Sequence, residues 1–505
     1  MPVTFPRLDR YTLLAVPLGL LGISWRIWLT LAGSPPTNSD EATMGLAALH
    51  VSQGRDFPIF FYGQHYMGTI DAYLSAPLVA LFGPSVAALR APTLALFAIF
   101  LVLMFALVRR LFSPGLAVLT VGLLAFGADR VVKNQLIAAG GYPETAPMVA
   151  GLLLLTYSLV TRARTRWYAF AGWGALFGLI TWNHWLPAPF LFGAAAVLVS
   201  ARVLSRRTGI AVVAGFGVGV LPLLIDNVHG GVATNSVAVF LELNSAGTDA
   251  GPWDRIIGGA WLGLPMGMGL CAPGRCAAWS LWWGPVFVVL LLVAAVMAVR
   301  ALRRAARPSE EWAGQALRLA LAGAGLLSLI SYVRSPAAAD SPIESARYLA
   351  LLGLALPAAL WPLWLVVRSG RATAIPAAVP IAALAATMLV ATVSLVPTAA
   401  RYARLRHDQR ELLVALDKAD LRYVHSEYWT CNWITYLSDE RIACGVVDDS
   451  LNRGLNRYPG YWREQAQAEV APVNSALDAA LARRMPGVVP QFVAGYHIYP
   501  GSSLS

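Results

Sequence analysis

Eleven apolar stretches constrain the fold of this chain more than any other feature of its sequence. A bilayer-spanning helix needs about 20 mostly apolar residues. With 57% hydrophobic residues and a mean hydropathy of +0.59, the chain of 505 residues is too apolar for a soluble enzyme. The sequence therefore predicts a polytopic α-helical membrane protein with about 11 transmembrane helices. The stretches, several of them short, lie at 11–32, 86–108, 114–128, 143–160, 167–181, 185–204, 209–226, 280–300, 316–333, 345–367 and 372–397.

Arginine clusters indicate how these helices are oriented. Arg109 and Arg110 follow the second stretch, Arg206 and Arg207 follow the sixth, and the other clusters also fall on that side. Short cytoplasmic loops are rich in Lys and Arg. We therefore expect a cytoplasmic amino terminus and an external carboxy terminus. The same arginines explain the net charge of +11, so a nucleic-acid partner is not expected.

Most loop carboxylates fall on the opposite, external side, and two adjacent ones lie just beyond the first span. Asp40 and Glu41 belong to the external segment 33–85. Charged groups close to the hydrocarbon are costly unless they have partners or a function. One interpretation is structural: Ser39 caps a short helix over 40–50, whose dipole the two acids complement. The other is catalytic, with Asp40 as a base at the membrane surface.

Further candidates lie in the other external segments. Aromatic residues interleaved with hydrogen-bonding groups are typical of the membrane interface, and they equally suit a sugar, whose faces stack while its hydroxyls need partners. His184 lies between two tryptophans, which also fits an interfacial belt. Arg347 opposes the positive-inside trend, so we expect it to have an anionic partner, either Glu344 or a phosphate. The candidate substrate-binding residues are Gln64, His65, Tyr66, Asp71, Arg90, Tyr142, Glu144, His184, Arg347 and Tyr348.

Residues 398–505 form a polar tail that is large enough for a small domain. A charged helix over 400–419, a strand over 421–425, a helix over 429–437 and a strand over 442–447 predict a small α/β extracytoplasmic accessory domain. The external cysteines form two close pairs, Cys271/Cys276 and Cys431/Cys444, which favours two local disulfides. Their spacing is not a zinc signature.

The acidic pair follows a first helix whose amino terminus is expected in the cytoplasm, and Arg347-Tyr348 lies at the head of a late span. In these two features the chain resembles membrane glycosyltransferases of the GT-C type. The chain looks most like the group of protein O-mannosyltransferases and lipid A aminoarabinose transferases. The run from Phe60 to Gly68 and the turn from Gly141 to Glu144 are similar to bacterial members of that group. The resemblance covers about the first 400 residues, so we expect residues 1–397 to form the catalytic module.

The resemblance implies an integral enzyme of the bacterial cytoplasmic membrane, active on the outer face. It would move a sugar from a polyprenyl-phosphate donor to an acceptor hydroxyl with inversion. Asp40 maps onto the base of the family, and Glu41 is expected to assist it. Arg347 maps onto a phosphate-contacting arginine, with Arg90 as a second candidate. The chain lacks the trefoil domain of the O-mannosyltransferases, so the acceptor stays open between lipid, glycan and protein.

Two questions stay open at the level of sequence. No cofactor is indicated, and a divalent metal at Asp40 and Glu41 stays an alternative that is disfavoured because neighbouring helical residues point about 100° apart. The main alternative function is a lipid or solute transporter or flippase. Transporters place ionisable groups near the bilayer midplane, whereas the predicted spans are nearly free of charge. The charge pattern therefore favours an enzyme.

Overall fold

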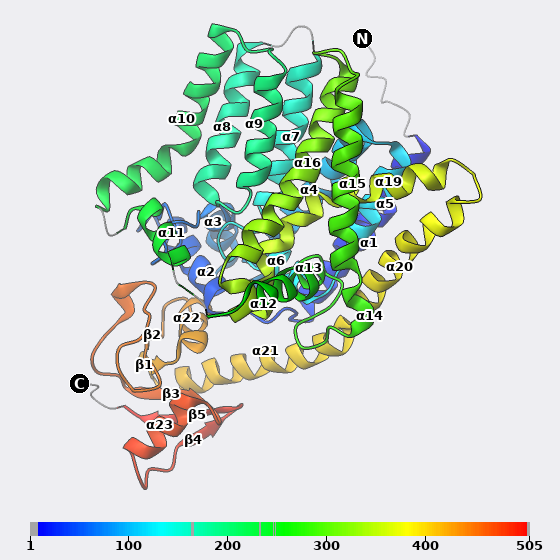
Figure 1. Ribbon diagram of the computed structural model, residues 1–505. Coiled ribbons are helices and arrows are strands. Elements are labelled where there is room, and N and C mark those ends of the chain that lie inside the picture. The colour runs from blue at the N-terminus through cyan, green and yellow to red at the C-terminus, as the bar shows by residue number, and fades with distance from the viewer. Residues whose placement is uncertain (1–8, 163–165, 232–233, 246, 248, 502–505) are drawn as a thin grey trace, which may run out of the picture. The chain divides into compact units, whose positions relative to one another are not determined.

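The computed structural model describes residues 9–162, 166–231, 234–245, 247 and 249–501 (Figure 1). The chain divides into two compact units. Unit 1 comprises Met1–Ile27, Leu94–Gln135 and Tyr142–Leu395, and unit 2 comprises Trp28–Thr93, Leu136–Gly141 and Val396–Ser505. Unit 2 thus joins the predicted external segment 33–85 to the polar tail. The expected boundary at residue 397 between a catalytic module and an accessory domain stays a prediction.

The regular secondary structure of unit 1 consists of helices in its described residues. Helices α1 (Arg10–Leu31) and α4 (Val86–Leu111) contribute to both units. The remaining elements are α5 (Pro114–Ala125), α6 (Asp129–Leu136), α7 (Thr145–Thr161), α8 (Trp167–Asn183), α9 (Ala188–Ser200), α10 (Arg206–His229), α11 (Ser236–Ser245), α12 (Pro252–Ile256), η1 (Ile257–Gly263), α13 (Leu264–Gly267), α14 (Ala278–Leu281), α15 (Trp283–Leu302), α16 (Glu310–Arg334), α17 (Ala337–Asp340), α18 (Pro342–Ser345), η2 (Ala346–Leu354), α19 (Leu356–Arg368) and α20 (Ala374–Val393).

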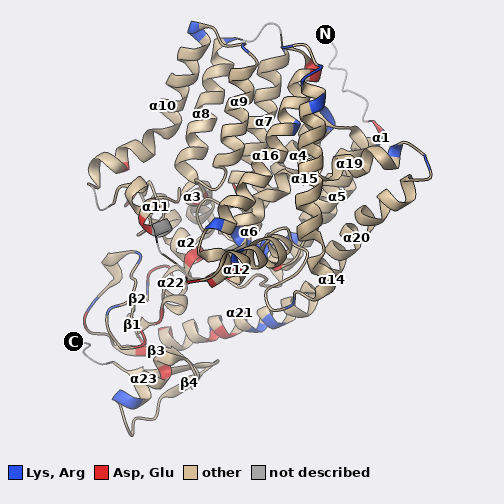
Figure 2. Cartoon of the chain, viewed as in Figure 1, with Lys and Arg blue, Asp and Glu red and all other residues tan. Residues whose placement is uncertain are grey.

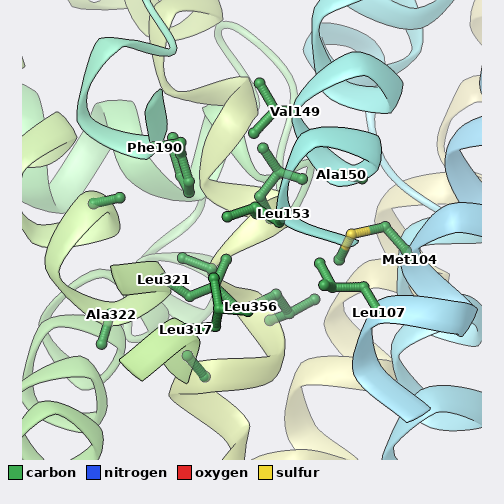
Figure 3. Close-up of a cluster of buried hydrophobic side chains, with 14 of the residues drawn as sticks. Met104, Leu107, Val149, Ala150, Leu153, Phe190, Leu317, Leu321, Ala322 and Leu356 are labelled. Carbon is green, nitrogen blue, oxygen red and sulfur yellow. The ribbon is translucent and has the colours of Figure 1, made fainter. Parts of the chain in front are cut away.

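Apolar side chains from distant parts of the sequence form the core of unit 1. Helices α4, α7, α9, α16 and α19 meet in the cluster of Figure 3, which includes Met104, Leu153, Phe190, Leu321 and Leu356. Helices α7, α8 and α9 carry no Lys, Arg, Asp or Glu, and Figure 2 shows them uncharged along their length. Charge-free helices suit a hydrocarbon environment, which agrees with an integral membrane protein.

Small residues let two of these helices approach closely. A Cβ atom added to Gly215 of α10 would lie 2.0 Å from the carbonyl oxygen of Ala171 in α8. One added to Gly178 of α8 would lie 2.4 Å from that of Phe216. No side chain fits in this space, so glycine is required at both positions. Such contacts are typical of helices that associate inside membranes.

Six helices in the described part of the chain are long and apolar enough to cross a membrane, or up to eight if two bent pairs each count as one span. The pairs are α5 with α6, bent by 91°, and α18–η2 with α19, bent by 52°. The second bend precedes Pro357, which lacks the N–H that a continuous helix needs. Helices α7, α8 and α9 are shorter than a typical span, with 17, 17 and 13 residues. The predicted number of 11 spans and their orientation therefore stay predictions.

Unit 2 combines helices of the external segment with a small mixed sheet. The strand order is β2-β1-β3-β5-β4, and β1 pairs in parallel with β2 and β3 while β5 runs antiparallel to β3 and β4. The sheet and the helix α22 lie in the tail, and its role as an extracytoplasmic accessory domain stays a prediction. The elements are α2 (Ser39–Ser52), α3 (Ile70–Phe82), α21 (Leu395–Lys418), β1 (Tyr423–Ser426), α22 (Tyr428–Leu437), β2 (Ala443–Val446), η3 (Pro459–Tyr461), β3 (Ala468–Pro472), α23 (Ala476–Arg484), β4 (Gln491–Val493) and β5 (Tyr496–Pro500).

Both predicted disulfides are present. Cys271 is bonded to Cys276 in unit 1, and Cys431 of α22 is bonded to Cys444 of β2 in unit 2. The second bond ties α22 to the sheet. It therefore fixes the helix whose first residue, Tyr428, contacts Asp40.

Candidate functional site

The acidic pair lies in the first turn of α2. The predicted cap is wrong by one residue: Asn38, not Ser39, caps the helix, and its Oδ1 accepts a hydrogen bond from the Glu41 N–H at 2.9 Å. Ser39 is instead buried, and its hydroxyl donates to the backbone carbonyl of Tyr428. Because Asp40 and Glu41 are consecutive helical residues, their side chains leave the helix in different directions. They consequently enter different environments.

Glu41 is fully buried and paired with an arginine. The Arg90 Nε donates to Glu41 Oε1 and the Arg90 Nη2 donates to Oε2, both at 2.7 Å. Neither side chain is exposed by more than 1%. This bidentate geometry is the strong form of an arginine–carboxylate pair. Both oxygens of Glu41 are occupied, so its position suits anchoring α2 to α4.

Asp40 is half-buried and is held by the tail. The Tyr428 hydroxyl donates to Asp40 Oδ1 at 2.6 Å, and the same hydroxyl accepts from Arg457 Nε at 3.0 Å. Burial, and next the charge of Asp40, raises the pKa of Tyr428, so this hydroxyl stays protonated as a donor. The other oxygen of Asp40, Oδ2, has no hydrogen bond among the described residues. Asp40 is therefore oriented through one oxygen and open at the other.

The arginine behind Tyr428 connects the site to the aromatic loop. The guanidinium of Arg457 lies 5.4 Å from the ring centroid of Phe61 and 5.5 Å from that of Tyr428. With its amide oxygen turned toward this guanidinium, Gln64 accepts from Arg457 Nη1 and Nη2 at 3.1 and 3.0 Å. Gln64 is thus connected to Asp40 in three steps, because Gln64 binds Arg457, Arg457 binds Tyr428, and Tyr428 binds Asp40. Of the predicted loop residues, Gln64 is the one that this chain of contacts links to Asp40.

Helix α22 is packed directly on α2. A Cβ atom added to Gly45 would lie 2.7 Å from the ring of Tyr436, so glycine is needed where the helices cross. The Tyr436 hydroxyl donates to the Ser85 carbonyl and accepts from the Ser85 N–H, each at 3.1 Å. Tyr436 therefore connects the tail both to α2 and to the segment before α4.

A second polar network closes the far end of α2. The ring of His50 is buried, with Nδ1 2.7 Å from the Tyr62 hydroxyl and Nε2 3.1 Å from Glu440. Burial would raise the pKa of Glu440, but hydrogen bonds from His50, Tyr461 and Arg55 outweigh it and lower the pKa to about 2. A depressed carboxyl pKa stabilises the fold above the ordinary carboxyl range, and this stability is lost as the pH falls toward 2. The network therefore holds loop and tail together at neutral pH.

Three other predicted residues of the loop also belong to unit 2. Asp71 is fully buried in the first turn of α3. His65 is half-buried and packs edge-on against Phe60, with ring centroids 6.4 Å apart. Tyr66 lies beside it and is half-buried. None of the described contacts links these three residues directly to Asp40, and their substrate-binding roles stay predictions.

The remaining predicted residues cluster in unit 1. The Arg347 guanidinium lies 5.4 Å from the ring centroid of Tyr348 and 6.0 Å from that of Tyr142. The Tyr142 ring lies 5.3 Å from the ring of His184, whose Nδ1 accepts from the Leu186 N–H at 3.1 Å. Glu144, two residues after Tyr142, is buried at the start of α7. Residues that are distant in sequence thus lie together around Arg347. A guanidinium this close to aromatic rings is attracted to their faces.

The residues that position Asp40 were not among the candidates expected from the sequence. Tyr428 and Arg457 come from the tail, which we expected to be accessory, and they are separated from Asp40 by most of the chain. A partial signal existed in the aromatic run around Arg457-Tyr458 and in the helix that begins near Trp429. Nothing in either pattern names a carboxylate as the partner.

The residues around Asp40 do not suit a divalent metal. Both oxygens of Glu41 are bonded to Arg90, which leaves Asp40 as a single carboxylate ligand. No group of three or more His, Cys, Asp or Glu side chains with metal-binding geometry occurs among the described residues. Hard divalent cations take several oxygen ligands, so we assign no step of the chemistry to a metal.

Comparisons with known proteins give a partial likeness to solved structures. No family model and no curated protein matches the chain. Among solved structures, the apo oligosaccharyltransferase of Archaeoglobus fulgidus is 12% identical, with a TM-score of 0.46, and the match covers 85% of this chain and 64% of that one. The structure of AglB, from the same organism, with an inhibitory peptide and a dolichol-phosphate is 12% identical, with a TM-score of 0.49, and covers 92% and 69%. A likeness of this size does not place the chain in a family, and its activity has to be inferred from its own residues.

Proposed function

We propose that this protein is an integral membrane glycosyltransferase that moves a sugar from a polyprenyl-phosphate carrier to an acceptor hydroxyl on the outer membrane face. Asp40 is the general base. The observation that carries the proposal is the difference in hydrogen bonding between two adjacent acids. Both carboxylate oxygens of Glu41 accept hydrogen bonds from Arg90. Asp40 is half-buried and accepts a hydrogen bond at Oδ1, which leaves its Oδ2 open. A fixed carboxylate with one accessible oxygen is what proton abstraction from a hydroxyl requires.

The proposed reaction is a single displacement. Asp40 Oδ2 takes the proton of the acceptor hydroxyl as its oxygen attacks the anomeric carbon of the sugar. The bond between that carbon and the carrier phosphate breaks, and the electron pair leaves with the phosphate. Attack opposite to the leaving group inverts the anomeric centre. Tyr428 and Arg457 keep the carboxylate in place, so the geometry does not have to be organised during the reaction.

The role proposed for Arg347 is to contact the phosphate of the carrier. A planar guanidinium binds phosphate oxygens with two parallel hydrogen bonds, and the rings of Tyr142 and Tyr348 set its orientation. A cation at the leaving phosphate stabilises charge that develops in the transition state. Tyr142 and His184, whose rings lie side by side, are proposed to line the path of the lipid-linked sugar.

Arg347→Ala tests this role. Hydrogen bonds to charged groups contribute about 1.5–3 kcal/mol each, so we expect the KM for the donor to rise roughly 10- to 100-fold. Steady-state transfer kinetics with varied donor measure the change. The matched control is Arg334→Ala, because Arg334 is an exposed arginine at the end of α16. An unchanged donor KM in Arg347→Ala would remove Arg347 from the phosphate site.

The proposal as a whole is tested with the purified full chain in proteoliposomes. A panel of polyprenyl-phosphate sugars is supplied with lipid, glycan and peptide acceptors, and free polyprenyl phosphate is measured. We expect release with at least one donor and none with nucleotide sugars. A transporter would move the intact lipid-linked sugar between leaflets without breaking the glycosidic bond. Movement without release, across the whole panel, would replace the transferase by that alternative.

A further inference from the structure

A pocket of about 320 Å³ lies within unit 2, apart from the open oxygen of Asp40. It forms where α1 ends, where α4 begins and along one side of α21. Its volume corresponds to about ten water molecules. The lining residues that carry the argument are Leu31, Gly33, Val86, Arg90, Arg406 and Arg410.

The pocket is strongly cationic. Every charged residue that lines it is an arginine, namely Arg90, Arg406 and Arg410. Arg406 lies over Gly33, where an added Cβ atom would be 3.4 Å from its Cδ and Nε atoms. Arg90 is fully buried, and its Nη1 has no hydrogen-bond partner among the described residues, although Nε and Nη2 are paired with Glu41. A buried guanidinium nitrogen without an acceptor is costly. The three arginines therefore favour an anion as the ligand of the pocket.

The start of α4 adds a second feature of anion sites. Ser85 precedes the helix, and its hydroxyl oxygen accepts from the Ala88 N–H at 3.2 Å. Val86 and Ala87 line the pocket, and the N–H groups of the first helical turn have no acceptor within the helix. Exposed N–H groups and the positive end of the helix dipole favour phosphate groups. Because α4 has 26 residues, its dipole is fully developed.

The surroundings of the pocket suit a lipid. Helices α1 and α4 are both long and apolar enough to cross a membrane, so the pocket lies where two candidate spans end and begin. Leu31 lines it and is 68% exposed, and Leu81 and Phe82, just before the pocket residue Pro84, are 74% and 75% exposed. A soluble anion would bind the three arginines but would make no favourable contact with the exposed apolar side chains beside them. A phosphate group that is attached to acyl or prenyl chains would bind the arginines through its oxygens and the apolar side chains through its hydrocarbon.

We propose that this pocket binds the phosphate group of a membrane lipid, held by Arg90, Arg406 and Arg410 at the start of α4. The site is distinct in its residues from Asp40 and from the Arg347 cluster. The proposal does not depend on sugar transfer. The lipid phosphate is either an anionic phospholipid headgroup or a polyprenyl phosphate, which share the chemistry that the arginines recognise.

The test is lipid binding to the purified full chain, measured by native mass spectrometry in detergent. The probes are phosphatidylglycerol, a short-chain polyprenyl phosphate, and diacylglycerol with the same acyl chains but no phosphate. We expect at least one phosphate lipid to bind about tenfold more tightly than diacylglycerol. The double variant R406Q/R410Q should lose about tenfold in that affinity, because two charge-assisted contacts are removed. The lipid with the larger loss identifies the occupant.

The matched control is R401Q/R404Q, which removes the same charge from α21. Arg401 and Arg404 are exposed and do not line the pocket. This control should bind the phosphate lipids like the unmodified chain. Equal loss in both double variants would indicate a general charge effect and overturn the site. Tight binding of inorganic phosphate, with no preference for either phosphate lipid over diacylglycerol, would overturn the lipid assignment.

Discussion

Asp40→Asn is expected to reduce sugar transfer by about 10²–10⁴-fold, because general-base catalysis typically contributes that factor. Asparagine keeps the size of the side chain and can still accept the hydrogen bond from Tyr428 at Oδ1. What it loses is the ability to take a proton at Oδ2. The decrease should therefore appear in kcat, with the KM for the donor nearly unchanged. Free polyprenyl phosphate released by the purified full chain measures both quantities.

Two tyrosine variants separate the role of Asp40 from a general loss of structure. Tyr428→Phe removes the hydroxyl that fixes Asp40, and a hydrogen bond of this kind contributes on the order of 1 kcal/mol, so we expect a decrease of about three- to tenfold. Tyr499→Phe is the matched control, because its hydroxyl donates to Asp478 at 2.7 Å, within the tail and away from Asp40. It should transfer sugar at the normal rate. Near-normal turnover by Asp40→Asn would remove Asp40 as the base, whatever the tyrosine variants show.

Local patterns predicted local structure well. The close spacing of Cys431 and Cys444 indicated a bond that the structure contains. The cap of α2 was assigned to the residue next to the true one, because Asn38 and Ser39 are both good capping residues. The bend between α5 and α6 was missed. The residues up to Phe126 are apolar, so their composition predicts one continuous helix. It gives no indication of the bend at Gly127, whose φ is +153°.

The contacts that define the site could not be predicted from one sequence. Asp40 meets Tyr428 across 388 positions of the chain, and Glu41 meets Arg90 across 49. Side chains on adjacent positions of a helix point in different directions, so the pair Asp40-Glu41 was expected to separate. Which acid would be buried depended on the partner helices α4 and α22. That information lies in tertiary packing, which neither composition nor periodicity contains.

Glu41→Gln is expected to destabilise the protein by about 3–5 kcal/mol, because it leaves the buried charge of Arg90 without a counterion. The reference is Arg422→Gln, which breaks an exposed pair with Asp417 in the same unit and should change the unfolding temperature little. The double variant Glu41→Leu/Arg90→Met replaces both charges by apolar groups. It should recover much of the lost stability, since a buried pair and a well-packed apolar replacement often differ little. Thermal unfolding of the purified chain in detergent measures all three.

The double variant also decides whether Glu41 takes part in the chemistry. If Glu41 only anchors α2, the refolded site still contains Asp40, Tyr428 and Arg457, and transfer per folded molecule should stay within about tenfold of normal. If Glu41 itself moves protons, restoring stability cannot restore turnover, and the double variant should be as inactive as Asp40→Asn. Recovery of both stability and turnover would assign to Glu41 a positioning role and leave Asp40 as the base. Because the double variant also removes Arg90, which lines the proposed lipid-phosphate pocket, stability without turnover is divided by the donor KM: a raised KM indicates the loss of Arg90, whereas a reduced kcat with an unchanged KM indicates that Glu41 acts in the reaction despite its two hydrogen bonds from Arg90.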